Sequence, residues 1–278
     1  MFKNITIGQH YPIESYIHNL DPRVKIIITF IFIISLFIVN NFAAYLFVVL
    51  FLSVIIVLSK VPVLMVIKGL KPILIIIIIT FLINVFMTSG EIIYTLGPLD
   101  ITKEGLTQAG FMALRLILLI MGTSMLTLTT SPILLTDGIE SLLNPYKKIG
   151  LPAHELAMMM TIALRFIPTL MEETEKIMKA QKARGADFES GNIFKRAKSL
   201  VPLLVPLFVS AFRRADDLAM AMEARCYRGG ENRTRMRQLG ITKKDIYAGV
   251  FTVVYLGIII YSRIYWWYYE RKKYKDYS

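Results

Sequence analysis

The sequence predicts an all-α, polytopic membrane protein with about five transmembrane helices and two long cytoplasmic helices. The first observation is a stretch from Ile26 to Ser59 that contains no charged residue. Such a stretch is hidden from water by a bilayer. The second is a set of further apolar stretches, and the third is a basic middle section that keeps helical periodicity. The overall hydrophobic content of 55% is close to that of soluble domains, so the distribution of apolar residues, and not their amount, excludes a soluble protein.

The uncharged stretch contains two predicted spans. One helix needs roughly 20 apolar residues to cross a bilayer, so the stretch is too long for one crossing. It divides at the polar pair Asn40-Asn41. We therefore expect a short first span from about Val24 to Val39 and a second from Phe42 to Ser59.

Two more spans follow before residue 131. Pro72 is expected to open the third, which continues from Ile73 to Met87, because proline suits the first turn of a helix. Residues 88–104 are expected to form a loop. The fourth span is predicted from about Thr102 to Thr130, with the Thr102 side chain as its N-cap. We place Arg115 near one end of this span and expect its side chain to snorkel towards water.

A fifth apolar stretch runs from Ile246 to Ser262 and precedes an aromatic cluster typical of a membrane interface. Lys and Arg gather before the first span and in residues 60–71, which predicts a cytoplasmic N-terminus in a multi-pass protein of the cell membrane. Five crossings would leave the basic tail after Tyr269 outside, against the same rule. Either the tail is an exception, or residues 152–171 or 199–212 enter the membrane.

The middle of the chain is predicted to be a separate, basic domain. Three regions result: residues 1–151 with four spans, residues 152–237 with two amphipathic helices, and residues 238–278 with the last span and the tail. The two helices are expected from about Ala153 to Arg184 and from about Asn192 to Tyr227, because apolar residues recur there at steps of three and four.

The two helices end alike. The first ends with Ala183-Arg184-Gly185 and the second with Ala224-Arg225-Cys226. An arginine in the last turn followed by a glycine is a common helix C-cap, which is the simpler explanation for one such end. Two of them on consecutive basic helices favour a paired docking device, because a guanidinium offers a planar fork to carboxylates and carbonyls.

These motifs resemble those of the transmembrane T subunits of energy-coupling factor (ECF) transporters, which are ATP-driven importers of vitamins and metal ions. The resemblance covers nearly the whole chain and implies that the two long helices are coupling helices. It implies that Arg184 and Arg225, with their neighbours in the two motifs, bind two cytoplasmic ABC-type ATPases. ATP and Mg would be bound by those ATPases, and this chain would bind no cofactor. Cys226 departs from the family's glycine, so the resemblance assigns no role to that third position.

The resemblance also implies a small substrate-binding membrane subunit as a partner. The long helices carry more apolar surface than one crossing pair buries, and an exposed patch of that size usually marks a partner or a membrane surface. Lipid contact and ordinary packing are the alternatives. The residues expected to contact the subunit are Met158, Met171, Phe208, Phe212, Leu218 and Met222.

Catalytic and metal-binding patterns are incomplete in this sequence. His154-Glu155 begins like a zinc-protease helix, but Met158 stands where the second histidine is required. The single Cys226 excludes a multi-cysteine metal site within the chain, and no P-loop is present. We therefore expect a non-catalytic chain with no metal site. The net charge of +12 indicates cytoplasmic loops, and the lipid bilayer, not nucleic acid, is the expected partner surface.

The function predicted is a transmembrane scaffold that couples ATP hydrolysis by two ABC ATPases to movement of the substrate-binding subunit. The alternative is an independent secondary transporter with a basic cytoplasmic regulatory domain. Ion-coupled carriers usually place acidic or histidine residues at mid-membrane, and Ile26 to Met87 and Ile246 to Ser262 contain none. A membrane-anchored adaptor without a transport role is a third possibility.

Overall fold

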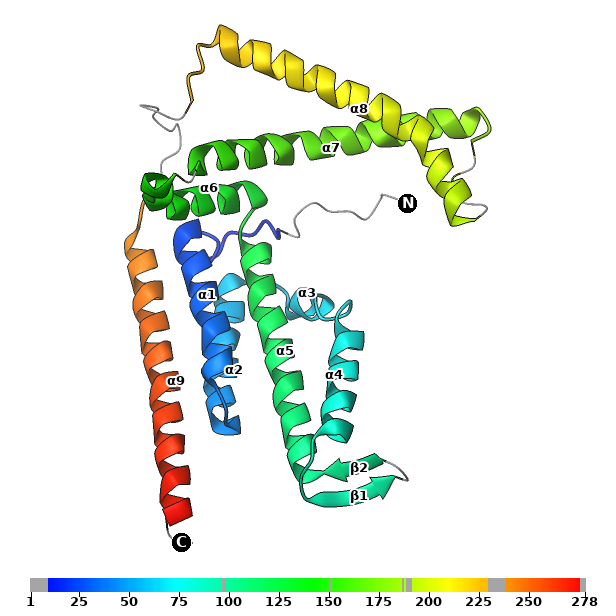
Figure 1. Cartoon of the computed structure of the whole chain (residues 1–278). Helices are drawn as coiled ribbons and strands as arrows, with labels where there is room; N and C mark the ends of the chain where they lie inside the picture. Colours follow the sequence, from blue (N-terminus) through cyan, green and yellow to red (C-terminus); the bar gives the residue numbers. More distant parts are fainter. Residues whose placement is uncertain are drawn as a thin grey trace. The chain divides into compact units, whose positions relative to one another are not determined.

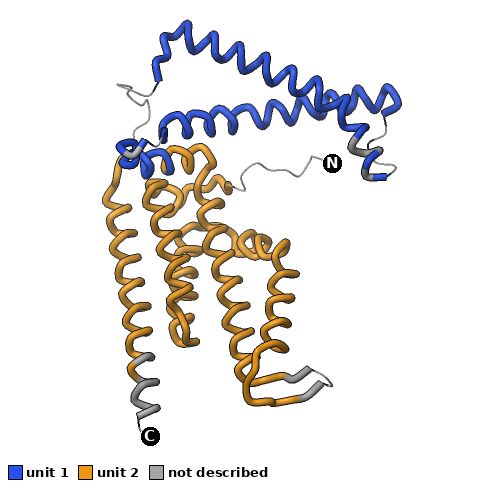
Figure 2. Tube along the Cα trace, viewed as in Figure 1, with its two compact units in different colours: residues 1–7, 139–238 blue, residues 8–138, 239–278 orange. Residues whose placement is uncertain are grey.

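The structure is a computed structural model that describes residues 10–96, 99–150, 152–186, 188, 192–229 and 239–275. Most of the described chain is helical, 79% of it, and strands are few, which confirms the all-α fold class (Figure 1). The chain forms two compact units, shown in Figure 2. Unit 2 comprises residues 8–138 and 239–278, and unit 1 comprises residues 1–7 and 139–238.

Unit 2 carries the helices that suit a membrane. Three are long and apolar enough to cross one: α2, α5 and the first part of α9, Lys243–Trp266. The helix α4 has 14 residues and α1 has 17, so both are shorter than those three. The bounds in unit 2 are α1 Pro22–Ile38, α2 Phe42–Ser59, α3 Val63–Lys68, α4 Leu74–Met87, α5 Lys103–Thr129 and α9 Lys243–Lys275.

The core of unit 2 lies among α1, α2, α5 and α9. The Phe51 ring on α2 stacks on Tyr255 of α9 with 4.0 Å between ring centroids. The Tyr255 hydroxyl in turn forms a 2.6 Å hydrogen bond with the Ser35 hydroxyl of α1. Gly122 lets α5 approach α1 closely, because a Cβ at that position would overlap the Phe32 ring.

The outward faces of the same helices remain apolar. Phe30, Leu46 and Ile75 are each about two-thirds exposed. Helices that are apolar on all sides occur inside large proteins or in membranes. These faces are therefore suited to contact with lipid, and the membrane character predicted from the sequence is confirmed.

A β-hairpin replaces part of the loop expected over residues 88–104. The strands β1 Ile92–Leu96 and β2 Leu99–Thr102 pair in antiparallel fashion. The signal was present in the sequence, because β-branched and aromatic residues from Ile92 flank the Gly97-Pro98 pair. The cap prediction is confirmed: the Thr102 hydroxyl accepts a 3.0 Å hydrogen bond from the Gly105 amide at the start of α5.

The start of the third apolar segment also differs from the prediction. Pro72 does not open the helix, since α4 begins at Leu74 after a series of turns, in which the Ile73 amide bonds to the Leu70 carbonyl. The preceding connection contains the short helix α3, Val63–Lys68. Each deviation reflects turn chemistry that local apolar periodicity does not report.

Arg115 lies in the middle of α5, and the expectation that it snorkels from one end of its span is wrong. Its Nε donates to the Tyr45 hydroxyl at 3.3 Å and one Nη donates to the Val39 carbonyl at 3.1 Å. Its partners are therefore the end of α1 and the start of α2. The turn between these two helices lies beside the middle of α5.

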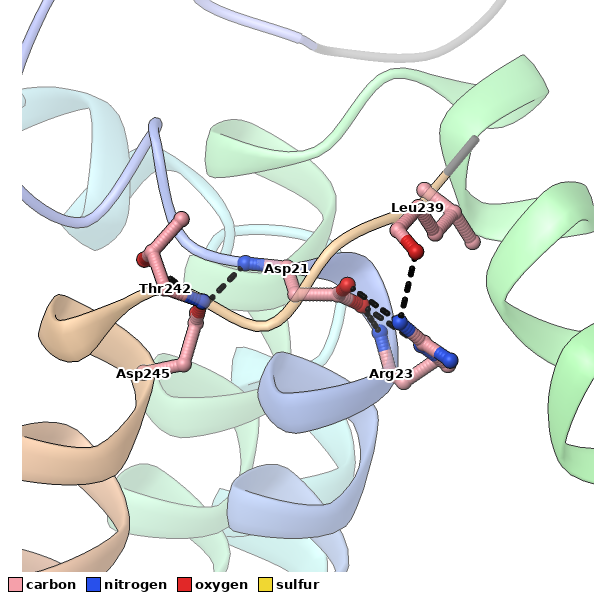
Figure 3. Close-up of polar contacts among 5 residues, drawn as sticks. All are labelled: Asp21, Arg23, Leu239, Thr242 and Asp245. Carbon is pink, nitrogen blue, oxygen red and sulfur yellow. Dashed lines mark hydrogen bonds and ion pairs between the residues drawn. The ribbon is translucent and has the colours of Figure 1, made fainter. Parts of the chain in front are cut away.

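A buried polar network joins the N-termini of α1 and α9 (Figure 3). One Asp245 oxygen accepts a 2.7 Å hydrogen bond from the Asp21 amide, and the other accepts from the amide and hydroxyl of Thr242, both at 2.7 Å. Asp21 caps α1 and forms an ion pair with Arg23, which also donates to the Leu239 carbonyl. We call these five residues the Asp245 network.

Two of its members are nearly inaccessible to water: Asp21 is 6% exposed and Asp245 is 2% exposed. The side-chain hydrogen bond from Arg23 holds the pKa of Asp21 below its ordinary value of 3.8. A carboxyl group with a lowered pKa stabilises the fold at all pH values above the ordinary pKa, and this contribution is lost as the pH falls below it. The network is therefore intact at neutral pH.

Replacing Asp245 by alanine should destabilise unit 2 by about 3 kcal/mol, because it removes a helix cap and leaves the buried Asp21 amide without its acceptor. The midpoint of thermal unfolding in mild detergent should fall by about 5 to 10 °C. Asp245→Asn retains one side-chain carbonyl oxygen, so its unfolding midpoint should lie between those of the wild type and Asp245→Ala. The control is Asp217→Ala at an exposed position of helix α8, Ile193–Ala224. Equal midpoints for Asp245→Ala and Asp217→Ala would show that the network does not hold α9 in place.

Candidate docking site on the two long helices

Unit 1 is built around the two long helices that the sequence predicts. The helix α7 covers Ala153–Ala183 and α8 covers Ile193–Ala224, within a few residues of the expected bounds. They follow α6, Pro132–Leu143, and the 3-10 helix η1, Asn144–Ile149, neither of which was predicted as a separate element. Both long helices continue through internal prolines, among them Pro168 in α7.

An ion pair marks the point where α8 crosses α7 (Figure 1). An Arg214 Nη lies 2.9 Å from Glu173 Oε2, with both side chains partly exposed. A hydrogen bond from the Ser210 hydroxyl, assisted by the Arg214 charge, lowers the pKa of Glu173. The Glu173 carboxylate therefore accepts hydrogen bonds from side chains on two successive turns of α8. The pair was not predicted, although its residue types and helical positions were visible in the sequence.

The crossing falls at equivalent positions of the two helices. Glu173 and Arg214 are 41 residues apart, as are Arg184 and Arg225. Arg184 thus lies eleven residues after Glu173, and Arg225 lies eleven residues after Arg214. At 1.5 Å per residue each arginine ends an arm of about 16 Å that starts at the crossing.

The first arm ends in a Schellman motif. The Gly185 amide donates to the Lys182 carbonyl at 3.0 Å, and the Ala186 amide donates to the Gln181 carbonyl at 2.9 Å. Gly185 has a φ of +88°, the left-handed conformation that this motif requires. Arg184 is the C-cap residue and its side chain is exposed.

The second arm ends in the same motif. The Cys226 amide donates to the Glu223 carbonyl at 2.8 Å, and the Tyr227 amide donates to the Met222 carbonyl at 3.0 Å. Cys226 takes the left-handed position with a φ of +56°. Its backbone therefore does what Gly185 does in the first copy, at the cost of the steric strain of a Cβ. Arg225 is exposed like Arg184, and so are Ala183 and Ala224.

The six residues expected to contact a substrate-binding subunit fall into two groups. Phe208 is 61% exposed and Phe212 is 69% exposed. Leu218 and Met222, in the last turns of α8, are half-buried. On α7, Met158 and Met171 are half-buried as well.

The exposed group belongs to a longer apolar face that sequence analysis missed in part. Val201 and Val205, which are 50% and 56% exposed, precede Phe208 and Phe212 at steps of four and three. These four residues form the α8 apolar face. The same periodicity that identified Phe208 would have found both valines, had the stripe been followed back towards the start of the helix.

Metal chemistry has little support in the part of the chain that the structure describes. No group of three His, Cys, Asp or Glu side chains is close enough there to hold an ion. His154 Nδ1 lies 3.0 Å from Glu140 Oε1 within unit 1, an arrangement that links α7 to α6. The described site is thus a surface of cations and apolar side chains suited to binding other proteins.

This chain is similar to known proteins over most of its length. The profile of the CbiQ family, described as "Cobalt transport protein", matches residues 14–236. A protein of Thermosediminibacter oceani named "Energy-coupling factor transporter transmembrane protein EcfT" is 62% identical over 264 residues, covering 95% of this chain and all of that protein. Proteins of the same name from Clostridium kluyveri and Bacillus subtilis are 61% and 51% identical, over 96% and 95% of this chain and 99% and 100% of theirs. The resemblance to ECF transporter T subunits is confirmed.

Substituting Cys226 by glycine should strengthen the second cap by about 1 kcal/mol, because it removes the cost of a Cβ at positive φ. Gly185→Ala should weaken the first cap by a similar amount, since a Cβ there meets no atom within 4 Å and only backbone strain acts. Amide hydrogen exchange at positions 226 and 227 should slow about fivefold in the first variant, and exchange at positions 185 and 186 should quicken about fivefold in the second.

The control for this pair is Cys226→Ala, which removes the thiol but keeps a Cβ. It should leave exchange at Tyr227 unchanged. If alanine slowed exchange as much as glycine, the thiol and not the backbone conformation would be responsible, and the equivalence of the two caps would be wrong.

Proposed function

Because the chain belongs to the CbiQ family and is a transmembrane component of an ECF transporter, we propose that its two long helices couple ATP hydrolysis to transport. In this proposal two cytoplasmic ABC-type ATPases bind the ends of α7 and α8, and their movement displaces a small membrane subunit that carries the substrate. Vitamins or other micronutrients are the substrate class. The chain does not itself hydrolyse ATP, and ATP and Mg are bound by the ATPases.

The observation that carries the proposal is the pair of exposed arginines held by the same cap on two crossing helices. A Schellman motif fixes the last turn, so each guanidinium is presented from a defined backbone position. A planar fork on such a support matches carboxylate or carbonyl acceptors of a partner. Two equal arms favour two similar partners over a single one.

The α8 apolar face supports the second half of the proposal. Its four side chains lie on the opposite side of α8 from Arg214, so packing against α7 leaves them uncovered within unit 1. Contiguous exposed apolar surface usually marks a protein or membrane contact. We assign it to the substrate-binding subunit, which as a membrane protein presents apolar helices of its own.

The proposed orientation places the N-terminus in the cytoplasm of a multi-pass protein in the cell membrane. Lys and Arg near the ends of spans favour the cytoplasmic side, and they occur in the first turn of α1, as Arg23 and Lys25, and between α2 and α4. The two ATPases must lie on the side where ATP is present. Unit 1, with its basic helices, is accordingly proposed to be cytoplasmic.

Replacing both Arg184 and Arg225 by alanine should abolish ATP-driven uptake while the protein still inserts in the membrane. Truncating a buried, hydrogen-bonded charge at an interface costs on the order of 2 to 5 kcal/mol, so each single variant should weaken ATPase retention and the double variant should lose it. Lysine in place of either arginine should restore little of the ATPase binding or uptake, because it lacks the planar fork. The measurement is ATPase recovery with the affinity-purified chain, together with substrate uptake.

The matched control is Arg228→Ala, which removes an exposed arginine three residues beyond the second cap. It should leave both measurements unchanged. Wild-type uptake by the well-expressed Arg184→Ala, Arg225→Ala variant would refute the docking role.

Phe212→Glu should have the reverse effect: loss of the substrate-binding subunit on gentle extraction, with the ATPases retained. A carboxylate on the α8 apolar face would have to be buried without a partner, which is strongly unfavourable. Met171→Glu tests the half-buried side of α7 in the same way. The control is Arg213→Glu, which places an acidic residue at the neighbouring exposed position, off the apolar face.

Quantifying the three kinds of subunit after extraction separates the explanations. Poor insertion of Phe212→Glu without selective loss of a partner would identify the face as lipid-contacting. Equal retention of all subunits by a well-expressed variant would show that the α8 apolar face does not bind the substrate-binding subunit.

A further inference from the structure

Unit 2 contains a polar cavity at the turn between α1 and α2, away from the Asp245 network. Its volume is about 480 Å³, and its walls come from that turn, from α5 and from α9. The polar side chains that line it are Asn40, Asn41, Gln108, Arg115, Ser262 and Arg263. We call it the Arg115–Arg263 cavity.

The cavity has a positive charge that no carboxylate in the described part of the chain balances. Two guanidinium groups line it, and no lining residue is a carboxylate. Arg115 donates to the Val39 carbonyl and to the Tyr45 hydroxyl, and Arg263 donates to the Ile38 carbonyl at 2.6 Å. Within the described part of the chain these acceptors are neutral, and no carboxylate pairs with either arginine.

Charges in this position need a counter-charge. The two arginines come from helices that suit a membrane, where an uncompensated charge is costly and like charges facing one cavity add to the cost. Arg115 is half-buried, whereas Arg263 is exposed. An anion that enters from the outer surface at α9 could therefore contact both guanidiniums without crossing the core.

The surroundings of the cavity fit a lipid better than a free ion. The Phe42 and Phe111 rings stack beside it with 4.0 Å between centroids, and Met112 also lines the wall. Trp266 borders the cavity and is 41% exposed, next to Tyr265 at 59%. Tryptophan and tyrosine on the outside of membrane helices gather at headgroup level. A phosphate group at the arginines would leave acyl chains against apolar helix faces.

We propose that the Arg115–Arg263 cavity binds the phosphate group of an anionic phospholipid, with the two guanidiniums as a clamp. Arginine matches phosphate oxygens with paired N–H donors, and each guanidinium keeps a terminal nitrogen that donates to no acceptor in the described chain. The lipid would also brace α9 against the end of α1. This proposal is independent of the coupling function of unit 1.

Native mass spectrometry of the full chain in neutral detergent tests the proposal, with phosphatidylglycerol and phosphatidylcholine as probes. The wild-type protein should retain phosphatidylglycerol about tenfold better than phosphatidylcholine. Arg263→Gln should remove that preference, and the variant with Arg115→Gln added should bind both lipids equally weakly. Arg263→Lys should keep part of the preference through its charge. Lys68→Gln, at an exposed cation of α3, is the control and should behave like the wild type.

Two results would overturn the proposal. One is an unchanged preference for phosphatidylglycerol in folded Arg263→Gln, a variant that alters only an exposed residue and so tests the site even if the double variant fails to fold. The other is displacement of phosphatidylglycerol by millimolar inorganic phosphate with the same dependence on Arg263, which would identify a free-anion site.

Discussion

The contact between Asp245 and the Asp21 amide holds together parts of the chain that are 224 residues apart in sequence. Unit 2 is discontinuous in the sequence, since residues 139–238, which belong to unit 1, separate α9 from the other helices of unit 2. A carboxylate that caps α9 and also accepts from the N-cap residue of α1 fixes both helix starts with one side chain. The stacked Phe51 and Tyr255 rings and the Ser35 hydroxyl then align α9 along the other helices.

The same unit surrounds two of its buried or half-buried cations with neutral oxygens that accept their hydrogen bonds. Lys25, which is 5% exposed, donates to the His18 and Thr129 carbonyls and to the Thr130 hydroxyl. Arg115 likewise bonds to a carbonyl and a hydroxyl. Carbonyl dipoles lower the cost of burying a cation but leave its charge in place. At Lys25 three neutral acceptors surround one ammonium group, and the Asp21 and Asp245 carboxylates attract its charge. The Arg115–Arg263 cavity instead brings two guanidiniums together with no carboxylate in its lining.

Unit 1 holds two exposed arginines at the capped ends of two helices, each eleven residues beyond the crossing point. The Glu173–Arg214 pair sets the crossing, and each arm ends in a closed hydrogen-bonded cap. In the proposed docking role, an arginine on a frayed helix end would lose conformational entropy on binding, and the cap would remove part of that cost in advance. Cys226 shows that the backbone conformation, and not glycine itself, is what the two copies have in common.

The sequence by itself determined the features that depend on local patterns. The long helices, the Thr102 cap and the paired helix ends could be predicted because apolar periodicity and capping residues act within a few turns. Tertiary structure decided what depends on distant neighbours. It gave Arg115 its partners at the α1–α2 turn, left Phe208 exposed while Leu218 and Met222 are half-buried, and set the crossing at Glu173. A helical stripe states which residues share a face, but only packing between segments decides which face is covered, because that depends on where another part of the chain lies.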